Sequence, residues 1–125
     1  MDYARIPLRI ERKELKPGIV VLMMTGPIQM GPHCKQIEEK VAELIDAGER
    51  RLVFDLSGVH TMDSTGLGEI VACFSKLKKS GGLLRLAGIG GTLSGLLKMT
   101  HVDRVIKIYP TALAASEDVW TDGEV

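Results

Sequence analysis

The chain has 125 residues, of which 45% are hydrophobic and 26% are charged, a balance typical of one globular domain and not of a disordered segment. Sixteen basic residues cancel sixteen acidic ones and only 4% of residues are aromatic, so nucleic acid is not an expected partner. No apolar run approaches the ~18 residues of a membrane span and the N-terminus does not resemble a signal peptide, so we expect a cytoplasmic protein without membrane contact.

The first part of the chain predicts a β-hairpin followed by a helix. Residues 6–12 alternate apolar and polar side chains, and residues 19–24 form a continuous apolar run after a turn at 16–18. The first strand should have one solvated face, and the second should be covered on both faces. A loop rich in proline and glycine then leads to an amphipathic helix over residues 32–47. Its predicted apolar face comprises Cys34, Ile37, Val41, Leu44 and Ile45.

Strands and helices alternate in the rest of the chain. The predicted elements are a strand at 51–56, a helix that ends in a lysine-rich turn at 76–79, a strand at 83–87, a helix at 92–99, a strand at 105–108 and a helix of about ten residues from Pro110. The inward positions expected on these helices are Leu67, Ile70, Val71, Phe74, Leu77, Leu93, Leu96, Leu97, Leu113, Ala114 and Val119. Val102 should pack near the third helix. Trp120 should cover the end of the core, and residues 121–125 should fray.

This order of elements predicts an α/β fold. Strand–helix–strand units joined by short loops require parallel pairing with right-handed crossovers. We therefore expect a single domain over residues 1–125, with a mixed sheet of four to five strands, an N-terminal hairpin and about four helices packed on it.

The sequence offers no clear metal or cofactor site. Cys34 and Cys73 fall within predicted helices and lack CxxC spacing, which favours buried free thiols. The histidines lie apart in loops or at helix ends without the spacing of a ligand pair, so we expect them to be solvated. They are His33, His60 and His101. We expect neither a metal nor a cofactor.

Two motifs suggest catalysis or nucleotide binding, and both are incomplete. His60, Asp63 and Ser64 could supply the groups of a catalytic triad, but residues so close in sequence rarely adopt its geometry, and no GxSxG motif is present. The glycine-rich turn at 88–92 follows a strand and opens a helix, but Leu93 replaces the third glycine of a dinucleotide motif. We therefore expect no catalytic residue and interpret the glycine-rich turn as structural.

The most informative segment is the polar turn Asp63-Ser64-Thr65-Gly66, at the start of a predicted helix. Helix capping accounts for one of its polar side chains, or for two, because Asp, Ser and Thr accept hydrogen bonds from the first N–H groups of a helix. At least one hydroxyl then remains free. A phosphate on that hydroxyl would meet unpaired N–H groups and the positive end of the helix dipole. Capping and phosphorylation are the two interpretations of this turn.

The region around this turn resembles a known family. Residues 53–68, VFDLSGVHTMDSTGLG, are similar to the signature of STAS domains, specifically of bacterial anti-sigma factor antagonists. The similarity extends to residues 25–26, 81–83, 93–100 and 105–108. One departure lies in the loop after Gly26, where family members often carry an acidic residue and this chain has Gln29 after Pro27.

The resemblance implies a switch between two binding states. The serine after the aspartate, here Ser64, would be phosphorylated by an anti-sigma factor that is also a Ser/Thr kinase, and Thr65 is a second, weaker candidate. The unphosphorylated protein would bind the anti-sigma factor and free the sigma factor. Phosphorylation would end that binding, and a phosphatase would restore it. The expected partner-binding residues are Gln29, Met30, Asp63, Ser64, Thr65, Gly66, Leu67 and Gly68.

The same residues are compatible with other functions. The chain could be a STAS interaction module of another bacterial signalling assembly, or a STAS domain that binds a nucleotide or small anion at the same helix N-terminus. A small enzyme that uses His60 and Ser64 is a third possibility.

Overall fold

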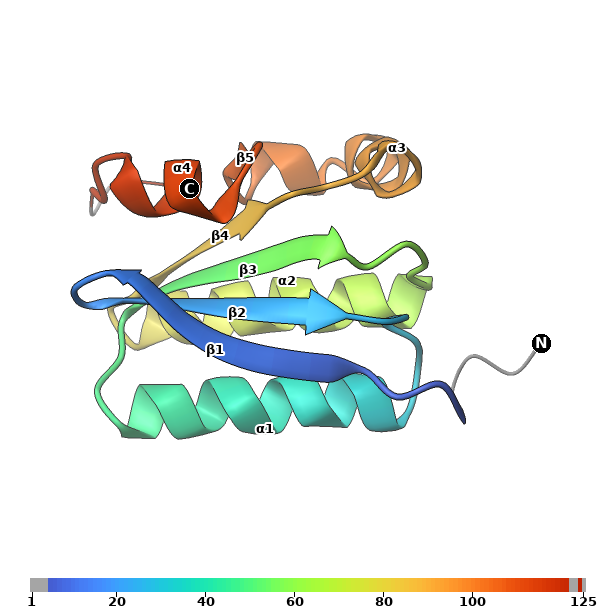
Figure 1. Ribbon diagram of the computed structural model, residues 1–125, viewed down its shortest axis with the longest axis horizontal. Helices are drawn as coiled ribbons and strands as arrows, with labels where there is room; N and C mark the ends of the chain where they lie inside the picture. Colours follow the sequence, from blue (N-terminus) through green and yellow to red (C-terminus); the bar gives the residue numbers. More distant parts are fainter. Residues whose placement is uncertain (1–4, 122–123, 125) are drawn as a thin grey trace.

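One mixed β-sheet organises residues 5–121 and 124, the part of the chain that the computed structural model describes (Figure 1). Its five strands are β1 (Arg9–Lys16), β2 (Ile19–Thr25), β3 (Arg51–Gly58), β4 (Leu83–Ala87) and β5 (Ile108–Tyr109). Their spatial order is their sequence order; β1 pairs antiparallel with β2, and every later pair is parallel. The predicted α/β fold, with its mixed sheet and N-terminal hairpin, is confirmed.

The helices connect the parallel strands and cover both faces of the sheet. They are α1 (Pro32–Asp46), α2 (Ser64–Lys79), α3 (Gly91–Met99), the short 3-10 helix η2 (Val102–Arg104) and α4 (Ala112–Glu117). In Figure 1, α1 and α2 run side by side along one face of the sheet, and α4 lies on the other side. None of the helices within the described ranges is both long and apolar enough to span a bilayer.

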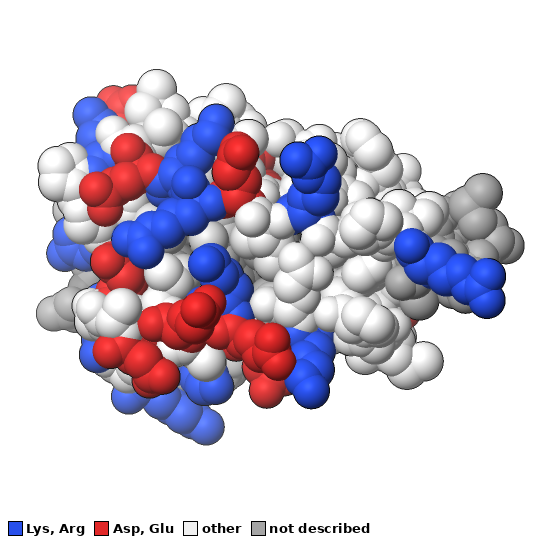
Figure 2. Space-filling model, turned by 60° about the horizontal axis from the view of Figure 1, so that its bottom comes forward, with Lys and Arg blue, Asp and Glu red and all other residues white. Residues whose placement is uncertain are grey.

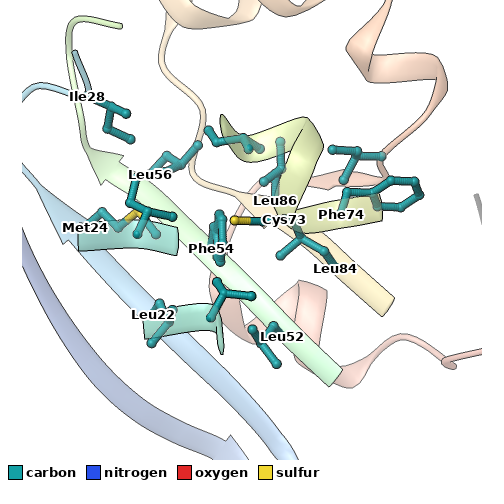
Figure 3. Close-up of a cluster of buried hydrophobic side chains, with 14 of the residues drawn as sticks. Leu22, Met24, Ile28, Leu52, Phe54, Leu56, Cys73, Phe74, Leu84 and Leu86 are labelled. Atoms are coloured by element: carbon teal, nitrogen blue, oxygen red, sulfur yellow. The ribbon is translucent and has the colours of Figure 1, made fainter. Parts of the chain in front are cut away.

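Apolar side chains are buried on both faces of the central strands, because successive residues of a strand point to opposite sides. The larger core, between the sheet and α1 to α3, includes Leu22, Met24, Leu52, Phe54, Leu56, Cys73, Phe74, Leu84 and Leu86 (Figure 3). The smaller core faces α4 and includes Ile19, Val21, Val53, Ala87, Ala112 and Ala115. The continuous apolar runs at 19–24, 51–56 and 83–87 therefore fill both cores, as their composition predicts.

The edge strand β1 begins and ends later than the predicted range of residues 6–12. Its pairing with β2 runs from Arg9 opposite Thr25 to Lys16 opposite Ile19, so the hairpin continues up to the turn. Alternation identifies a strand with one solvated face but does not show where its pairing begins. Most of β1 is exposed, and its charged side chains protect this sheet edge from pairing with other chains. They are Arg9, Glu11, Arg12, Lys13, Glu14 and Lys16.

The C-terminal elements differ from the prediction in position and in length. β5 comprises only Ile108–Tyr109, and Val105, predicted to lie in this strand, is exposed after η2. α4 has six residues instead of about ten. Its inward face consists of small residues, which allow the helix to lie close to the sheet: Ala112, Ala115 and Ser116.

Three inward positions predicted for the last helix are therefore wrong or only partly right. Leu113 and Val119 are exposed, and Ala114 is half-buried. Trp120, in contrast, packs against the smaller core, as predicted. The predicted fraying of residues 121–125 is wrong for Glu124, which is buried, while residues 122, 123 and 125 lie outside the described ranges.

Two leucines, one in α3 and one in α4, allow the burial of these helices' side chains to be tested. Leu97 of α3 is 2% exposed and Leu113 of α4 is 49% exposed, although the sequence predicted both to be inward. We expect Leu97→Ala to lower the free energy of unfolding by about 2–5 kcal/mol, because it leaves a cavity. Leu113→Ala should lower it by less than about 1 kcal/mol. Urea denaturation of both variants measures these changes, and equal losses would contradict the orientation of α4.

Candidate functional site

The loop after β2 and the loop after β3 run side by side and form one surface at the start of α2. A parallel bridge between Ile28 and Met62 continues the pairing of β2 with β3 past the ends of both strands. Three backbone hydrogen bonds join the loops: Gly26 N to Gly58 O (3.0 Å), Ile28 N to Thr61 O (3.1 Å) and Asp63 N to Ile28 O (3.3 Å). The loop at residues 26–31 is therefore held against the mouth of α2.

The carboxylate of Asp63 connects these two parts through its side chain. Its Oδ1 accepts a hydrogen bond from the backbone N–H of Gly66 at 2.7 Å, and this bond caps α2. Its Oδ2 accepts a bond from the backbone N–H of Met30 at 2.9 Å. Because one rigid carboxylate makes both bonds, the position of the loop is coupled to the first turn of the helix.

Ser64 and Thr65 are left without a capping role. They are the first two residues of α2, and both are exposed. Asp63 already occupies the N-cap position, and within residues 5–121 and 124 neither hydroxyl has a hydrogen-bond partner. The sequence predicts at least one free hydroxyl at this helix N-terminus, and the structure has two, on Ser64 and Thr65. Both are accessible from solvent.

Gly66 allows α2 to approach the loop at residues 26–31 closely. A Cβ atom at this position would lie 2.4 Å from the backbone oxygen of Ile28, well inside van der Waals contact. Gly66 is buried, and Leu67 points into the larger core. Gly66 and Leu67 are among the partner-binding residues expected from the sequence, but both are buried and add little to the exposed surface. Gly68, further along the helix, has open space around it.

His33 supports the other end of the loop. It is 2% exposed, so the expectation of a solvated histidine is wrong. Its Nδ1 accepts a hydrogen bond from the backbone N–H of Gln29 at 3.1 Å. Its Nε2 lies 2.7 Å from the carbonyl oxygen of Ile6, and a carbonyl can only accept, so Nε2 carries the proton and the ring is neutral. The other two histidines, His60 and His101, are exposed as predicted.

A helical pattern in the sequence could have revealed the burial of His33. The inward residues of α1 are His33, Ile37, Val41 and Leu44, spaced by four, four and three positions. The predicted face placed Cys34 there instead, but Cys34 is half-buried and its Sγ donates to Gln29 O at 3.4 Å.

The exposed part of the site is mostly apolar or uncharged. The Met30 side chain is 66% exposed beside the mouth of α2, and Gln29 is half-buried. Figure 2 shows that charged side chains gather over the end at which α1 and α2 finish, and that far fewer lie over the end at which both helices begin. The site is a hydroxyl pair and an apolar side chain on a surface with little charge.

The triad that His60, Asp63 and Ser64 could supply is not formed within the described ranges. No hydrogen bond joins His60 to Asp63 or Ser64 in the described ranges; His60 instead borders a small hollow with residues 90–93. Burial, followed by the nearby Glu69 carboxylate, raises the pKa of both Cys34 and Cys73, so these thiols stay protonated at neutral pH. Burial also raises the pKa of Glu69 itself. Within residues 5–121 and 124, no cluster of three His, Cys, Asp or Glu side chains could hold a metal ion.

Comparison with known proteins identifies the family. The STAS domain family matches residues 12–115, which include every strand-to-helix connection described above. The chain belongs to the STAS domain family. Its mixed sheet with the helix-capping turn after β3 is the expected arrangement, and the resemblance found in residues 53–68 is confirmed.

Two relatives of this STAS domain bear the name of anti-sigma factor antagonists. A Thermotoga maritima protein with that name, given provisionally, is 34% identical over 77 residues, which cover 62% of this chain and 68% of the relative. The anti-sigma-B factor antagonist of Bacillus subtilis is 38% identical over 72 residues, or 58% of this chain and 65% of the relative. These similarities relate the STAS domain to the anti-sigma factor antagonists.

Solved structures support the same relationship. The crystal structure of a Thermotoga maritima protein, again provisionally an anti-sigma factor antagonist, has a TM-score of 0.79 and 28% identity, and the match covers 86% of this chain and 92% of that one. The phosphorylated form of the Bacillus cell fate determinant SpoIIAA has a TM-score of 0.68 at 17% identity, with 87% and 97% covered. At 17% identity, the match to SpoIIAA shows a similarity of fold alone.

A pair of glycine substitutions in α2 tests the close approach of the loop. We expect Gly66→Ala to lower the free energy of unfolding by about 1–3 kcal/mol, because the new methyl group would overlap the Ile28 carbonyl. Gly68→Ala should raise it by about 0.5–1 kcal/mol, because alanine favours the helix and meets no neighbour there. Thermal or urea denaturation measures both changes. Stabilisation by both substitutions would show that the loop does not lie against Gly66.

Proposed function

We propose that this STAS domain is an anti-sigma factor antagonist, a regulatory protein of the cytoplasm and not an enzyme. It binds an anti-sigma factor that is also a Ser/Thr kinase, and binding frees the sigma factor. Phosphorylation of Ser64 ends the interaction, and a phosphatase reverses the modification. The names of the two relatives support the regulatory class.

The observation that carries the proposal is the division of roles at the mouth of α2. Asp63 provides the cap, so the hydroxyl of Ser64 is exposed and is not needed to hold the helix together. A kinase can reach such a hydroxyl without unfolding the protein. A related fold, that of SpoIIAA, has been solved in a phosphorylated form, which supports modification of this kind on a STAS domain. Thr65 is the second candidate acceptor.

Phosphorylation would change the charge of the surface more than its shape. A phosphoserine adds about −1.5 to −2 charges at neutral pH. The N-terminus of α2 tolerates an anion, because the helix dipole is positive there. Asp63 lies next to the modified residue and is already negative, so a partner that docks on this surface would have to bury two neighbouring anions. That cost is the proposed cause of release.

The proposed docking surface consists of the exposed groups around the hydroxyl pair. Met30 provides a flexible apolar contact, and its main chain is fixed by Asp63. Gln29 is uncharged, and residues 26–31 contain no acidic or basic side chain, so the loop adds no charge of its own. Gly66 and Leu67 shape the surface from below and do not contact the partner. The proposed contact residues are Gln29, Met30, Asp63, Ser64, Thr65 and Gly68.

Two other functions have less support from the geometry. A nucleotide or small anion at the N-terminus of α2 would compete with the Asp63 carboxylate, which already accepts the N–H of Gly66. An enzyme that uses Ser64 as a nucleophile would need a base in contact with it, and the neighbouring groups do not provide that contact within the described ranges. An interaction module in another bacterial signalling assembly would use the same surface with a different partner.

The switch is tested with substitutions at Ser64. We expect Ser64→Asp to weaken binding to the kinase-type anti-sigma factor at least about tenfold, or ~1.4 kcal/mol, because it places a second carboxylate beside Asp63. Ser64→Ala should keep the affinity of the wild type. Titration calorimetry with each variant measures the difference, and equal affinity for both would contradict the charge mechanism.

Phosphate mapping provides the matched control. After incubation with the anti-sigma factor and ATP, mass spectrometry should find phosphate on the wild type and on Thr65→Ala, and none on Ser64→Ala. Phosphate that is still found on Ser64→Ala but not on Thr65→Ala would identify Thr65 as the phosphorylated residue. Its absence from the wild type would refute the switch but not the docking surface.

A further inference from the structure

Arg85 is a fully buried charged residue of the sheet that the proposed function does not use. It lies in the middle of β4, its side chain is 0% exposed, and strand alternation places it on the α4 face of the sheet. A buried guanidinium is stable only if every donor has an acceptor and its charge is compensated. The C-terminal part of the chain provides both.

All five N–H groups of Arg85 have acceptors. Three of them bond backbone carbonyls at the end of α4: Ala115 O (2.7 Å), Asp118 O (2.9 Å) and Val119 O (2.5 Å). The remaining edge, formed by Nε and Nη2, faces Glu124, whose two carboxylate oxygens lie at 2.8 and 2.6 Å. This is the two-pronged arrangement in which arginine recognises a carboxylate.

The guanidinium also has contacts that do not involve Glu124. It lies 3.8 Å from the ring centre of Trp120 and 5.1 Å from that of Tyr109. The Tyr109 hydroxyl in turn donates to Asp118 Oδ2 at 2.6 Å, which fixes the ring and the end of α4. The carbonyls and the rings thus contact the guanidinium in addition to Glu124.

The surroundings of the Arg85 guanidinium have an excess of positive charge. Lys107 Nζ lies 3.8 Å from Glu124 Oε1, and Lys78 Nζ donates to the backbone oxygen of Glu124. Together with Arg85, three cations face Glu124, and Asp118 adds a second carboxylate nearby. Lys107 is partly exposed, so one side of the site is open to water.

We propose that Arg85, with Trp120, Tyr109 and Lys107, forms a carboxylate-binding site in which the chain's own Glu124 is the bound ligand. The Glu124 side chain is then bound to β4 through its carboxylate. When Glu124 is absent, the Nε and Nη2 donors of Arg85 and the surrounding positive charge bind a carboxylate from solution. This site is independent of the proposed switch, because Arg85 points to the face of the sheet opposite the mouth of α2.

Chemical rescue of a Glu124→Ala variant tests the site. The substitution removes the γ-methylene and the carboxylate, and propionate supplies the carboxylate again. We expect the melting temperature of the variant to fall by roughly 10 °C, since the substitution leaves a buried cation unpaired. Propionate should restore much of this loss in a saturable manner. Propanamide, which has the same shape but no charge, should restore little. Equal effects of propionate and propanamide would overturn the proposal.

Two further variants separate the loss of this carboxylate from a general loss of stability. Glu117→Ala removes an exposed glutamate of α4, and its melting temperature should neither fall nor respond to propionate. If Glu124→Ala does not fold, Glu124→Gln is used in its place. This variant should melt at a lower temperature than the wild type, and acrylamide should quench its Trp120 fluorescence more strongly. Wild-type quenching and melting temperature in Glu124→Gln would overturn the proposal, as the carboxylate charge would then be dispensable.

Discussion

The two hydrogen bonds accepted by the Asp63 carboxylate determine the form of the candidate site. One bond closes the first turn of α2 and the other fixes the loop that carries Met30, so two segments distant in sequence keep a constant spacing. Gly66 makes this spacing possible, because any side chain there would push the loop away. The hydroxyls of Ser64 and Thr65 are free only because Asp63 does the capping. The chemistry of the surface therefore depends on a residue that is not itself modified.

Arg85 has a comparable role on the other face of the sheet. A single buried cation gathers the end of α4, two aromatic rings and Glu124 around one strand. The carbonyls at the end of a helix are suited to this, because they lack partners within the helix and carry the negative end of its dipole. In both places one polar side chain binds backbone atoms from more than one segment and fixes their spacing.

The sequence predicted the centre of the fold better than its ends. β4 was predicted with its observed bounds and α1 almost so, because apolar runs and helical periodicity are local signals. The polar turn was also located correctly, but three adjacent residues could each have capped the helix, so only the structure shows that Asp63 does. The helical spacing of His33, Ile37, Val41 and Leu44 could have indicated the burial of His33, but its bond to Ile6, 27 residues away, could not be read from a local pattern. The buried role of Arg85 was missed, since Glu124 is 39 residues away.

Residue size was a poor guide near the C-terminus. Leu113 and Val119 were predicted to be inward because they are large and apolar, whereas α4 packs through alanines. Single exposed apolar residues are common on protein surfaces, so hydrophobicity alone cannot decide the orientation of a helix of two turns. The family resemblance in residues 53–68, in contrast, involves a specific motif and held for fold and family alike.

The order of the strands has a consequence for how the chain folds. Because each strand pairs with the one that precedes it in sequence, every pairing closes a short stretch of chain, and the entropy lost in each closure is small. The sheet can therefore grow in the direction of synthesis, with each new strand adding to an edge that already exists. The pairing of Arg85 with Glu124 is the exception. During synthesis, the charge at the centre of β4 is neutralised only after Glu124, 39 residues further along the chain, has been added.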